Sequence, residues 1–157
     1  MKNKIDYVLG FAFNSDISQI LLIRKNRPDW QKGKYNGVGG KILDSEKGKT
    51  SNVAMVREFE EETGLRTRLS QWTICANLWG NGHNDMIDTD WYMDVFAIKL
   101  SDGEFAQAIS MTDELIMRFN VADLPMFHCI SNLACLIPIA KATLNNEIDY
   151  NLLLSLK

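Results

Sequence analysis

The sequence is poor in the residues that build disulfide frameworks and zinc sites. It has three cysteines, Cys75, Cys129 and Cys135, with no Cys-x-x-Cys pair, and only two histidines. Structural zinc sites need closely spaced Cys and His ligands, and disulfide scaffolds need paired cysteines. Both classes are therefore excluded, and we expect three reduced thiols.

Long apolar runs and an excess of positive charge are also lacking. No apolar run reaches the roughly 18 residues of a membrane-spanning helix, and the amino-terminal residues 1–11 lack the apolar segment of a signal peptide. A net charge of -3 and a pI of about 5.4 argue against the broad basic face of a general nucleic-acid or membrane binder. We expect a cytoplasmic protein that binds neither membranes nor nucleic acids stably.

The overall composition is that of a globular protein. Of the 157 residues, 46% are hydrophobic, and no low-complexity segment or linker divides the chain. Such a chain can bury a core of its own. We expect one domain over residues 1–157, as a monomer or homodimer.

Apolar periodicity predicts strands first and a helix next. Short apolar runs at Tyr7–Phe13 and Gln19–Ile23 predict a hairpin, and the glycine-containing segment 24–41 predicts a polar loop. Apolar residues at three- and four-residue steps predict a helix at about 50–63, capped by Thr50 or Ser51 and stopped by Gly64.

The second half of the chain repeats this order. It predicts strands near residues 69–79 and 91–100, joined by a polar loop at 81–90, then a strand at 115–119 and a helix at 131–145. The order lacks regular βαβ alternation. It therefore favours an α/β (α+β) fold in which helices pack on the faces of a mixed sheet.

Four carboxylates lie within five residues of the first predicted helix, in the segment Arg57-Glu58-Phe59-Glu60-Glu61-Glu62-Thr63-Gly64-Leu65. Glu61 and Glu62 follow Glu58 by three and four residues, so the three side chains share one helix face. An acidic run alone is more often a solvated helix face. A cluster of carboxylates on one face is also what a hard divalent cation such as Mg²⁺ prefers.

This segment, REFEEETGL, resembles the second half of the motif of the Nudix hydrolase family, and Gly39-Gly40-Lys41 resembles its glycine-rich opening. The resemblance implies an α/β/α sandwich with a central mixed sheet, and Mg²⁺- or Mn²⁺-dependent hydrolysis of a nucleoside diphosphate linkage. It implies that Glu58, Glu61, Glu62 and the Gly40 carbonyl bind the metal. Arg57 matches the arginine that orients the glutamates.

The spacing within the motif is irregular. Glu46 follows Gly40 at the family's distance, but Arg57 comes three residues late, and counting back from Arg57 reaches Lys49 instead. Either the loop carries a three-residue insertion and Glu46 pairs with Arg57, or that ion pair is absent.

Substrate-binding candidates lie on both sides of the motif. The segment KYNGVGGK resembles the loop of MutT-like, nucleotide-sanitising members, which implies that Asn36 contacts the base and makes Lys41 and the nearby Trp30 candidates. Asn36-Gly37 is also a common turn dipeptide. The segment Asp123-Leu124-Pro125-Met126-Phe127 with Asn132 is similar to the MutT base-reading region; Asn132 either reads the base or caps the last helix. Trp30 and Phe127 are candidate stacking platforms or core residues.

Glu114 precedes the predicted strand at 115–119, where several Nudix enzymes place an additional acid. Either Glu61 or Glu114 is the expected proton acceptor. The expected reaction converts a nucleoside triphosphate, with ribose or deoxyribose, to the monophosphate and pyrophosphate. The alternatives are a nucleotide sugar, a dinucleoside polyphosphate or a capped RNA end as substrate, or a Nudix module that senses nucleotides without hydrolysis.

Overall fold

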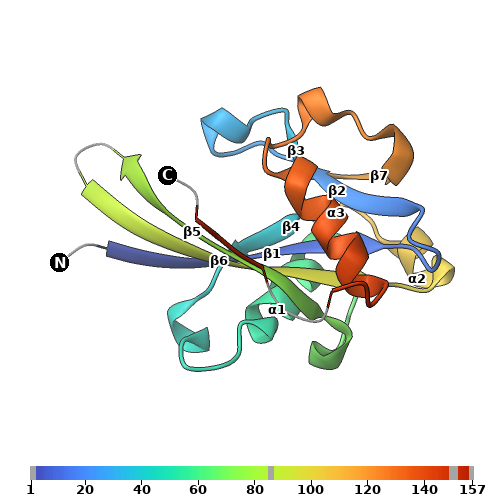
Figure 1. The fold of residues 1–157 in the computed structure, drawn as a ribbon, viewed down its shortest axis with the longest axis horizontal. Helices are drawn as coiled ribbons and strands as arrows, with labels where there is room; N and C mark the ends of the chain where they lie inside the picture. Colours follow the sequence, from blue (N-terminus) through green and yellow to red (C-terminus); the bar gives the residue numbers. More distant parts are fainter. Residues whose placement is uncertain (1–2, 85–86, 149–151, 156–157) are drawn as a thin grey trace.

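The computed structural model describes residues 3–84, 87–148 and 152–155, and within them eight strands form one mixed sheet. Helices pack on both of its faces (Figure 1). The strands are β1 (Asn3–Phe13), β2 (Gln19–Arg24), β3 (Tyr35–Asn36), β4 (Val38–Lys41), β5 (Thr73–Asn84), β6 (Ile87–Lys99), β7 (Leu115–Asn120) and β8 (Leu152–Ser155). The helices are α1 (Asn52–Thr63), α2 (Asp102–Gln107) and α3 (Leu133–Leu144), with five short 3-10 turns, η1 to η5, between the other elements.

Strand β1 organises the sheet. It pairs in parallel with β6 along its whole length, from Asn3 opposite Thr89 to Phe13 opposite Lys99. Its other edge is divided between β4, opposite Tyr7–Gly10, and β2, opposite Ala12 and Phe13. The predicted hairpin of β1 and β2 is therefore confirmed, but it is joined over only two residue pairs.

The alternation of side chains along β1 separates two cores. Leu9, Phe11 and Phe13 face α3, whereas Val8 and Ala12 face α1 and α2. Because successive strand residues point to opposite faces, one strand supplies both cores. The expected mixed sheet with helices on its two faces is confirmed.

Helix α1 forms as the sequence predicts. Ala54, Met55, Phe59 and Thr63 are buried on its inner side, and the helix stops at Gly64, which adopts a left-handed φ of 73°. Ser51 occupies the position before the first turn, but its side chain makes no capping hydrogen bond. The predicted helix end is confirmed, and the predicted side-chain cap is wrong.

Two predicted loops contain strands. The segment 24–41 holds β3 and β4, because Gly39 lets β4 approach β1 so closely that a Cβ there would lie 2.1 Å from the Val8 carbonyl oxygen. Most of the predicted loop at 81–90 extends β5 and β6; residues 85 and 86 of that loop lie outside the described residues. The 3-10 turn Leu69–Gln71 replaces the start of the predicted strand at 69–79, and α2 and β8 are elements that the sequence pattern did not predict.

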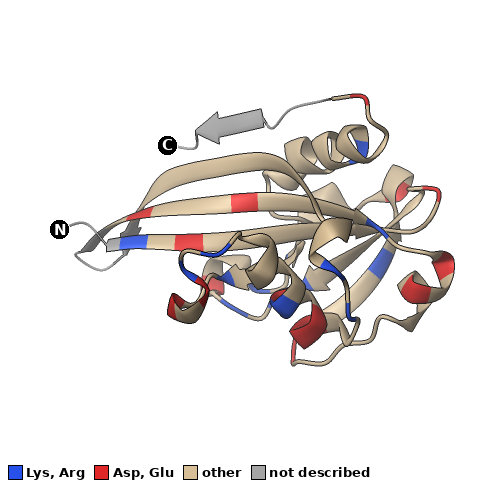
Figure 2. Cartoon of the chain, turned by 90° about the horizontal axis from the view of Figure 1, so that it is seen from below, with Lys and Arg blue, Asp and Glu red and all other residues tan. Residues whose placement is uncertain are grey.

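The remaining expectations concern thiols and membrane helices. All three cysteines are free, with Cys75 and Cys129 buried and Cys135 exposed. Among the described residues, no helix has the length and apolar character needed to span a bilayer. Figure 2 shows that charged residues are sparse on α3, whose sequence contains only one charged side chain, Lys141.

Candidate active site

The guanidinium of Arg57 on α1 joins the motif's loop to its helix. Its Nε donates to Glu46 Oε1 at 2.6 Å and its Nη2 donates to Glu46 Oε2 at 3.1 Å. Its Nη1 donates to Glu58 Oε1 at 2.8 Å and to Glu61 Oε2 at 3.1 Å. The Lys41 carbonyl oxygen accepts a further bond of 3.0 Å from Nη2. Arg57 therefore fixes two glutamates of the helix and the end of β4 at once.

The pairing with Glu46 resolves the irregular spacing of the motif. The Glu46 side chain is 8% exposed and bonds both Arg57 and the Leu43 backbone N–H. Hydrogen bonding to Arg57 lowers the pKa of Glu46 and raises that of Arg57. The first sequence alternative, an insertion with Glu46 reaching back to Arg57, is thus confirmed; Lys49 does not take that place.

The glutamates of α1 differ in their surroundings. Glu61 is exposed, whereas burial raises the pKa of Glu58 and raises that of Glu62 to about 8. The Glu62 Oε2 atom is buried and has no hydrogen-bond partner. A buried carboxylate oxygen without a partner is costly, so a cation at this point would stabilise the charged form.

Gly40 lies against Glu58. A Cβ at Gly40 would come within 2.4 Å of Glu58 Oε1. The lack of a side chain at this position is therefore what allows the Glu58 carboxylate to lie beside β4. This contact places β4 and α1 on two sides of the same site.

Glu114 joins these residues from the loop before β7. Its carboxylate is buried, with Lys25 Nζ at 2.6 Å from Oε2 and the Asn26 N–H at 3.0 Å from Oε1. The charges of Lys25, Glu58, Glu114 and Glu61 all affect the pKa of Glu62. We call Glu58, Glu61, Glu62 and Glu114 the carboxylate cluster.

The donor set of this cluster fits a hard divalent cation. The buried Glu62 oxygen has no hydrogen-bond partner, and the Glu58 carboxylate lies directly against Gly40. Within the described residues, however, no three Asp, Glu, His or Cys side chains already stand in a metal-binding arrangement. Glu58 and Glu61 are bonded to Arg57, so both carboxylates would have to adjust in order to hold a metal.

The predicted base-binding residues lie around β3. Asn36 ends β3, and its Oδ1 accepts from the Gly37 N–H at 2.8 Å while its Nδ2 is 3.4 Å from Gln31 Oε1. The Ile130 N–H donates to the Tyr35 carbonyl at 2.9 Å, which brings the segment before α3 alongside β3. The Asn132 Oδ1 atom is buried without a partner and makes no cap bond to α3. The cap interpretation of Asn132 is therefore wrong.

Both candidate stacking aromatics are on the surface. Trp30 lies in the 3-10 turn Asp29–Gln31 and is 63% exposed, and Phe127 in the turn Met126–His128 is fully exposed. Neither is a core residue. Lys41 is exposed as well.

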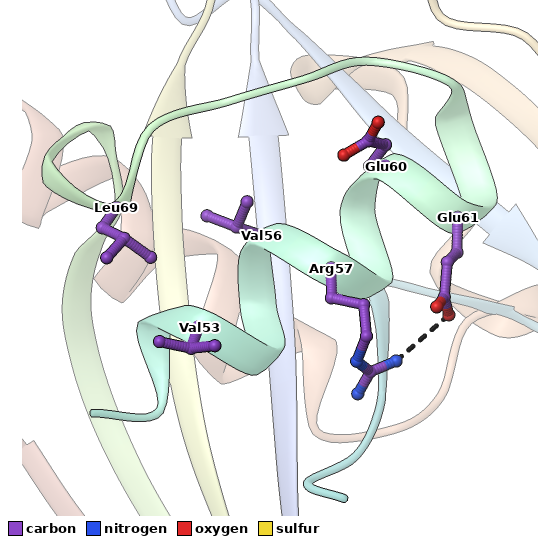
Figure 3. Close-up of a pocket in the computed structure, with 6 residues that line it drawn as sticks. All are labelled: Val53, Val56, Arg57, Glu60, Glu61 and Leu69. Atoms are coloured by element: carbon purple, nitrogen blue, oxygen red, sulfur yellow. Dashed lines mark hydrogen bonds and ion pairs between the residues drawn. The ribbon is translucent and has the colours of Figure 1, made fainter. Parts of the chain in front are cut away.

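A shallow pocket of about 560 Å³ lies along the outer side of α1 (Figure 3). Arg57 and Glu61 turn toward each other at one end of it, and Glu60 and the apolar side chains of Val53, Val56 and Leu69 line the rest. The pocket touches the carboxylate cluster only through Glu61, so it lies beside the site rather than at its centre.

Lys25 and Asn26 were not predicted as site residues, although both bind Glu114. A signal was present: Lys25 follows the strand that was expected at 19–23, and Glu114 precedes the strand expected at 115–119. Antiparallel pairing of those strands, with Arg24 opposite Leu115, brings the two side chains together. That pairing was not predicted.

Comparison with known proteins agrees with this geometry. The family model described as the NUDIX domain matches residues 4–132. Among solved structures, the NUDIX domain of Shewanella oneidensis NrtR, complexed with ADP ribose, has a TM-score of 0.70 at 16% identity, covering 92% of this chain and 90% of that one. A MutT structure from work on Aliivibrio salmonicida and Vibrio cholerae has a TM-score of 0.59 at 23% identity, over 90% and 96% of the two chains. The MutT NUDIX hydrolase of Burkholderia pseudomallei has a TM-score of 0.60 at 20% identity, over 79% of this chain and 88% of that one.

The family match, which spans both the motif and the sheet that carries it, shows that the chain belongs to the NUDIX family and is a Nudix hydrolase, an enzyme of pyrophosphate bonds.

Proposed function

We propose that the chain hydrolyses a nucleoside triphosphate, with ribose or deoxyribose, to the monophosphate and pyrophosphate. The observation that carries this proposal is a pair of buried side-chain oxygens without partners, Glu62 Oε2 and Asn132 Oδ1. Such atoms are rare in folded proteins because they lose hydrogen bonds to water. A metal-bound triphosphate would satisfy the first oxygen, and a donor on a nucleobase edge would satisfy the second.

The metal in this proposal is Mg²⁺, with Mn²⁺ as a substitute, held by Glu58, Glu61, Glu62 and the Gly40 carbonyl. Such an ion neutralises phosphate charge and makes bound water more acidic. Arg57 keeps Glu58 and Glu61 in place through its bonds of 2.8 and 3.1 Å. Lys41, exposed at the end of β4, would contact a phosphate.

Glu61 is the better candidate for the proton acceptor. Glu114 uses both carboxylate oxygens in bonds to Lys25 and Asn26, whereas Glu61 is 57% exposed and bonded through one oxygen only. A general base needs a free oxygen within hydrogen-bond distance of the attacking water. In this proposal Glu114 supports the metal site, and Glu61 takes the proton.

Base binding is assigned to the residues around β3. Asn36 Nδ2 has one long contact, and Asn132 offers an unpaired acceptor, so the two amides supply a donor and an acceptor. Trp30 and Phe127 are exposed aromatic side chains on the turns before β3 and before α3 and would stack on the base.

A second candidate substrate is another nucleoside diphosphate derivative. ADP ribose is the ligand of the NrtR NUDIX domain, whose fold this chain shares. Nucleotide sugars, dinucleoside polyphosphates and capped RNA ends contain the same linkage.

One experiment separates these possibilities. The purified protein with Mg²⁺ is offered nucleoside triphosphates, ADP ribose, nucleotide sugars, dinucleoside polyphosphates and capped RNA, and the products are identified. A monophosphate with pyrophosphate as the fastest reaction supports the proposal. Faster cleavage of ADP ribose to AMP and ribose phosphate favours the second candidate, and turnover of none of these compounds would overturn both candidates.

A further inference from the structure

The contact between Lys25 and Glu114 is an ion pair inside the site. The Lys25 side chain is 15% exposed and that of Glu114 is 6% exposed, and Nζ lies 2.6 Å from Oε2. An exposed pair of this kind contributes little, but an enclosed one is strongly held, since either charge alone would be costly. Lys25 is therefore fixed, unlike an ordinary surface lysine.

The backbone around this pair is equally fixed. Strands β2 and β7 lie side by side and end with Arg24 opposite Leu115, so Lys25 and Glu114 are the next residues beyond the ladder (Figure 1). On the other side, the Met111 N–H donates to the Glu62 carbonyl at 3.1 Å. Glu114 is thereby held between β2 and the last turn of α1.

Two positively charged side chains, Arg57 and Lys25, pair with different members of the carboxylate cluster. Arg57 bonds Glu58 and Glu61, and Lys25 bonds Glu114. Glu62 has no ion pair in either set, and Lys25 is the one charge that favours its ionised form against burial and the other carboxylates. The positive charge that acts on Glu62 thus comes from Lys25 in the loop after β2 rather than from α1 itself.

We propose that Lys25 is a built-in counter-cation of the carboxylate cluster. Its ammonium group holds Glu114 beside α1 and competes with the divalent metal ion for the negative charge of the cluster. This inference rests on the metal site of the proposed function. Lys25 is a positioning residue here, because it acts through Glu114 and Glu62. When a divalent ion binds, the ammonium group is repelled, so the intact site binds metal less tightly than the carboxylates alone would.

The test measures Mg²⁺ binding by calorimetry on the full chain without nucleotide. Lys25→Gln removes the charge and keeps a hydrogen-bond donor for Glu114, and Lys25→Met removes both. Each should bind Mg²⁺ about fivefold more tightly than wild type or better, since one positive charge near the ion has been lost. Lys25→Arg, which keeps the charge, should stay within about twofold of wild type.

The matched control is Lys32→Met, which removes the same charge from an exposed position in the same loop and should leave the affinity unchanged. If Lys25→Met fails to fold because Glu114 is left unpaired, Lys25→Gln decides the outcome. Unchanged or weaker Mg²⁺ binding in folded Lys25→Gln overturns the inference.

The substrate panel separates this inference from the proposed function. Tightened Mg²⁺ binding in Lys25→Gln supports the counter-cation even if no nucleoside triphosphate is cleaved. An active wild type whose Mg²⁺ affinity does not depend on the Lys25 charge overturns the counter-cation alone.

Discussion

Glu61 and Glu62 are adjacent in the chain and carry the same charge in opposite surroundings. Glu61 is 57% exposed, whereas the Glu62 carboxylate is buried and has one oxygen without a partner. An ionised carboxylate in that position opposes folding, because it has lost water without gaining bonds. In the proposed function, Glu62 contributes to metal binding at the expense of stability.

We predict that Glu61→Gln and Glu62→Gln each lower kcat by about two orders of magnitude or more, because an amide is a poor ligand for a hard cation and accepts no proton. The fold should be retained, as judged by circular dichroism. Glu60→Gln is the matched control on the same helix, since Glu60 pairs with Arg66 away from the cluster. Near-normal turnover in both test variants would remove the metal role of α1.

A substitution of the single residue Asn36 tests base recognition. An amide donates and accepts at once, so its loss should affect purine and pyrimidine substrates unequally. We predict that Asn36→Ala changes the ratio of kcat/KM values between purine and pyrimidine triphosphates. An equal loss on every nucleotide would make Asn36 structural, in keeping with its bond to the Gly37 N–H. Asn132→Ala, measured in parallel, would then become the test of the base reader.

At the scale of elements, the parts predicted well are those that local sequence determines. Helix α1 shows its apolar period and its Gly64 stop within one short segment, and the metal-ligand candidates lie on that segment. Strands β3 and β4 were not predicted because they exist only by pairing with β2 and β1. Lys25 was missed for the same reason, since its partner lies 89 residues away.

The motif's long loop is held to α1 by Glu46, and this link depends on pH. Arg57 lowers the pKa of Glu46 below its usual value of 4.5. The pair therefore adds stability above that pH and loses it as pH falls through the lowered pKa. We predict that Glu46→Gln lowers the free energy of unfolding by about 1–3 kcal/mol at pH 7.

The measurement is urea unfolding of both proteins across a pH series. The difference between wild type and Glu46→Gln should shrink as pH falls below 4.5. A difference that stays constant down to pH 3 or so would show that the ionised form of Glu46 is not what stabilises the loop.

Strand β4 shapes the site through Gly40. We predict that Gly40→Ala lowers kcat strongly, because its Cβ would displace the Glu58 carboxylate, which stands within 2.6 Å of that position. The clash is with the end of a side chain, so the melting temperature should change little. Gly33→Ala is a control for the loop, although its φ of 79° adds local strain. Full activity in Gly40→Ala would show that Glu58 does not need its described position.

At the scale of the whole molecule, the carboxylate cluster joins distant parts of the chain. Glu58, Glu61 and Glu62 come from α1, Glu114 comes from the loop before β7, and Lys25 follows β2. The unfolded chain cannot assemble this set. A ligand that binds only the folded form stabilises it in proportion to the logarithm of its concentration.

We predict that Mg²⁺ in the millimolar range raises the melting temperature of the wild type, and that Glu62→Gln loses most of this rise. Differential scanning fluorimetry over a Mg²⁺ titration, at constant ionic strength set with NaCl, measures both. An unchanged melting temperature across the titration would count against a metal site formed by the cluster.

The parallel pairing of β1 with β6 has a consequence for how the chain is made. The ribosome synthesises β1 first, but its partner along the whole of Asn3–Phe13 is complete only when Lys99 has left the exit tunnel. Until then, β1 can pair only with β2 and β4, and its β6 edge remains open to wrong pairing. The sheet on both edges of β1 can therefore be completed only late in translation, after β6 has been made.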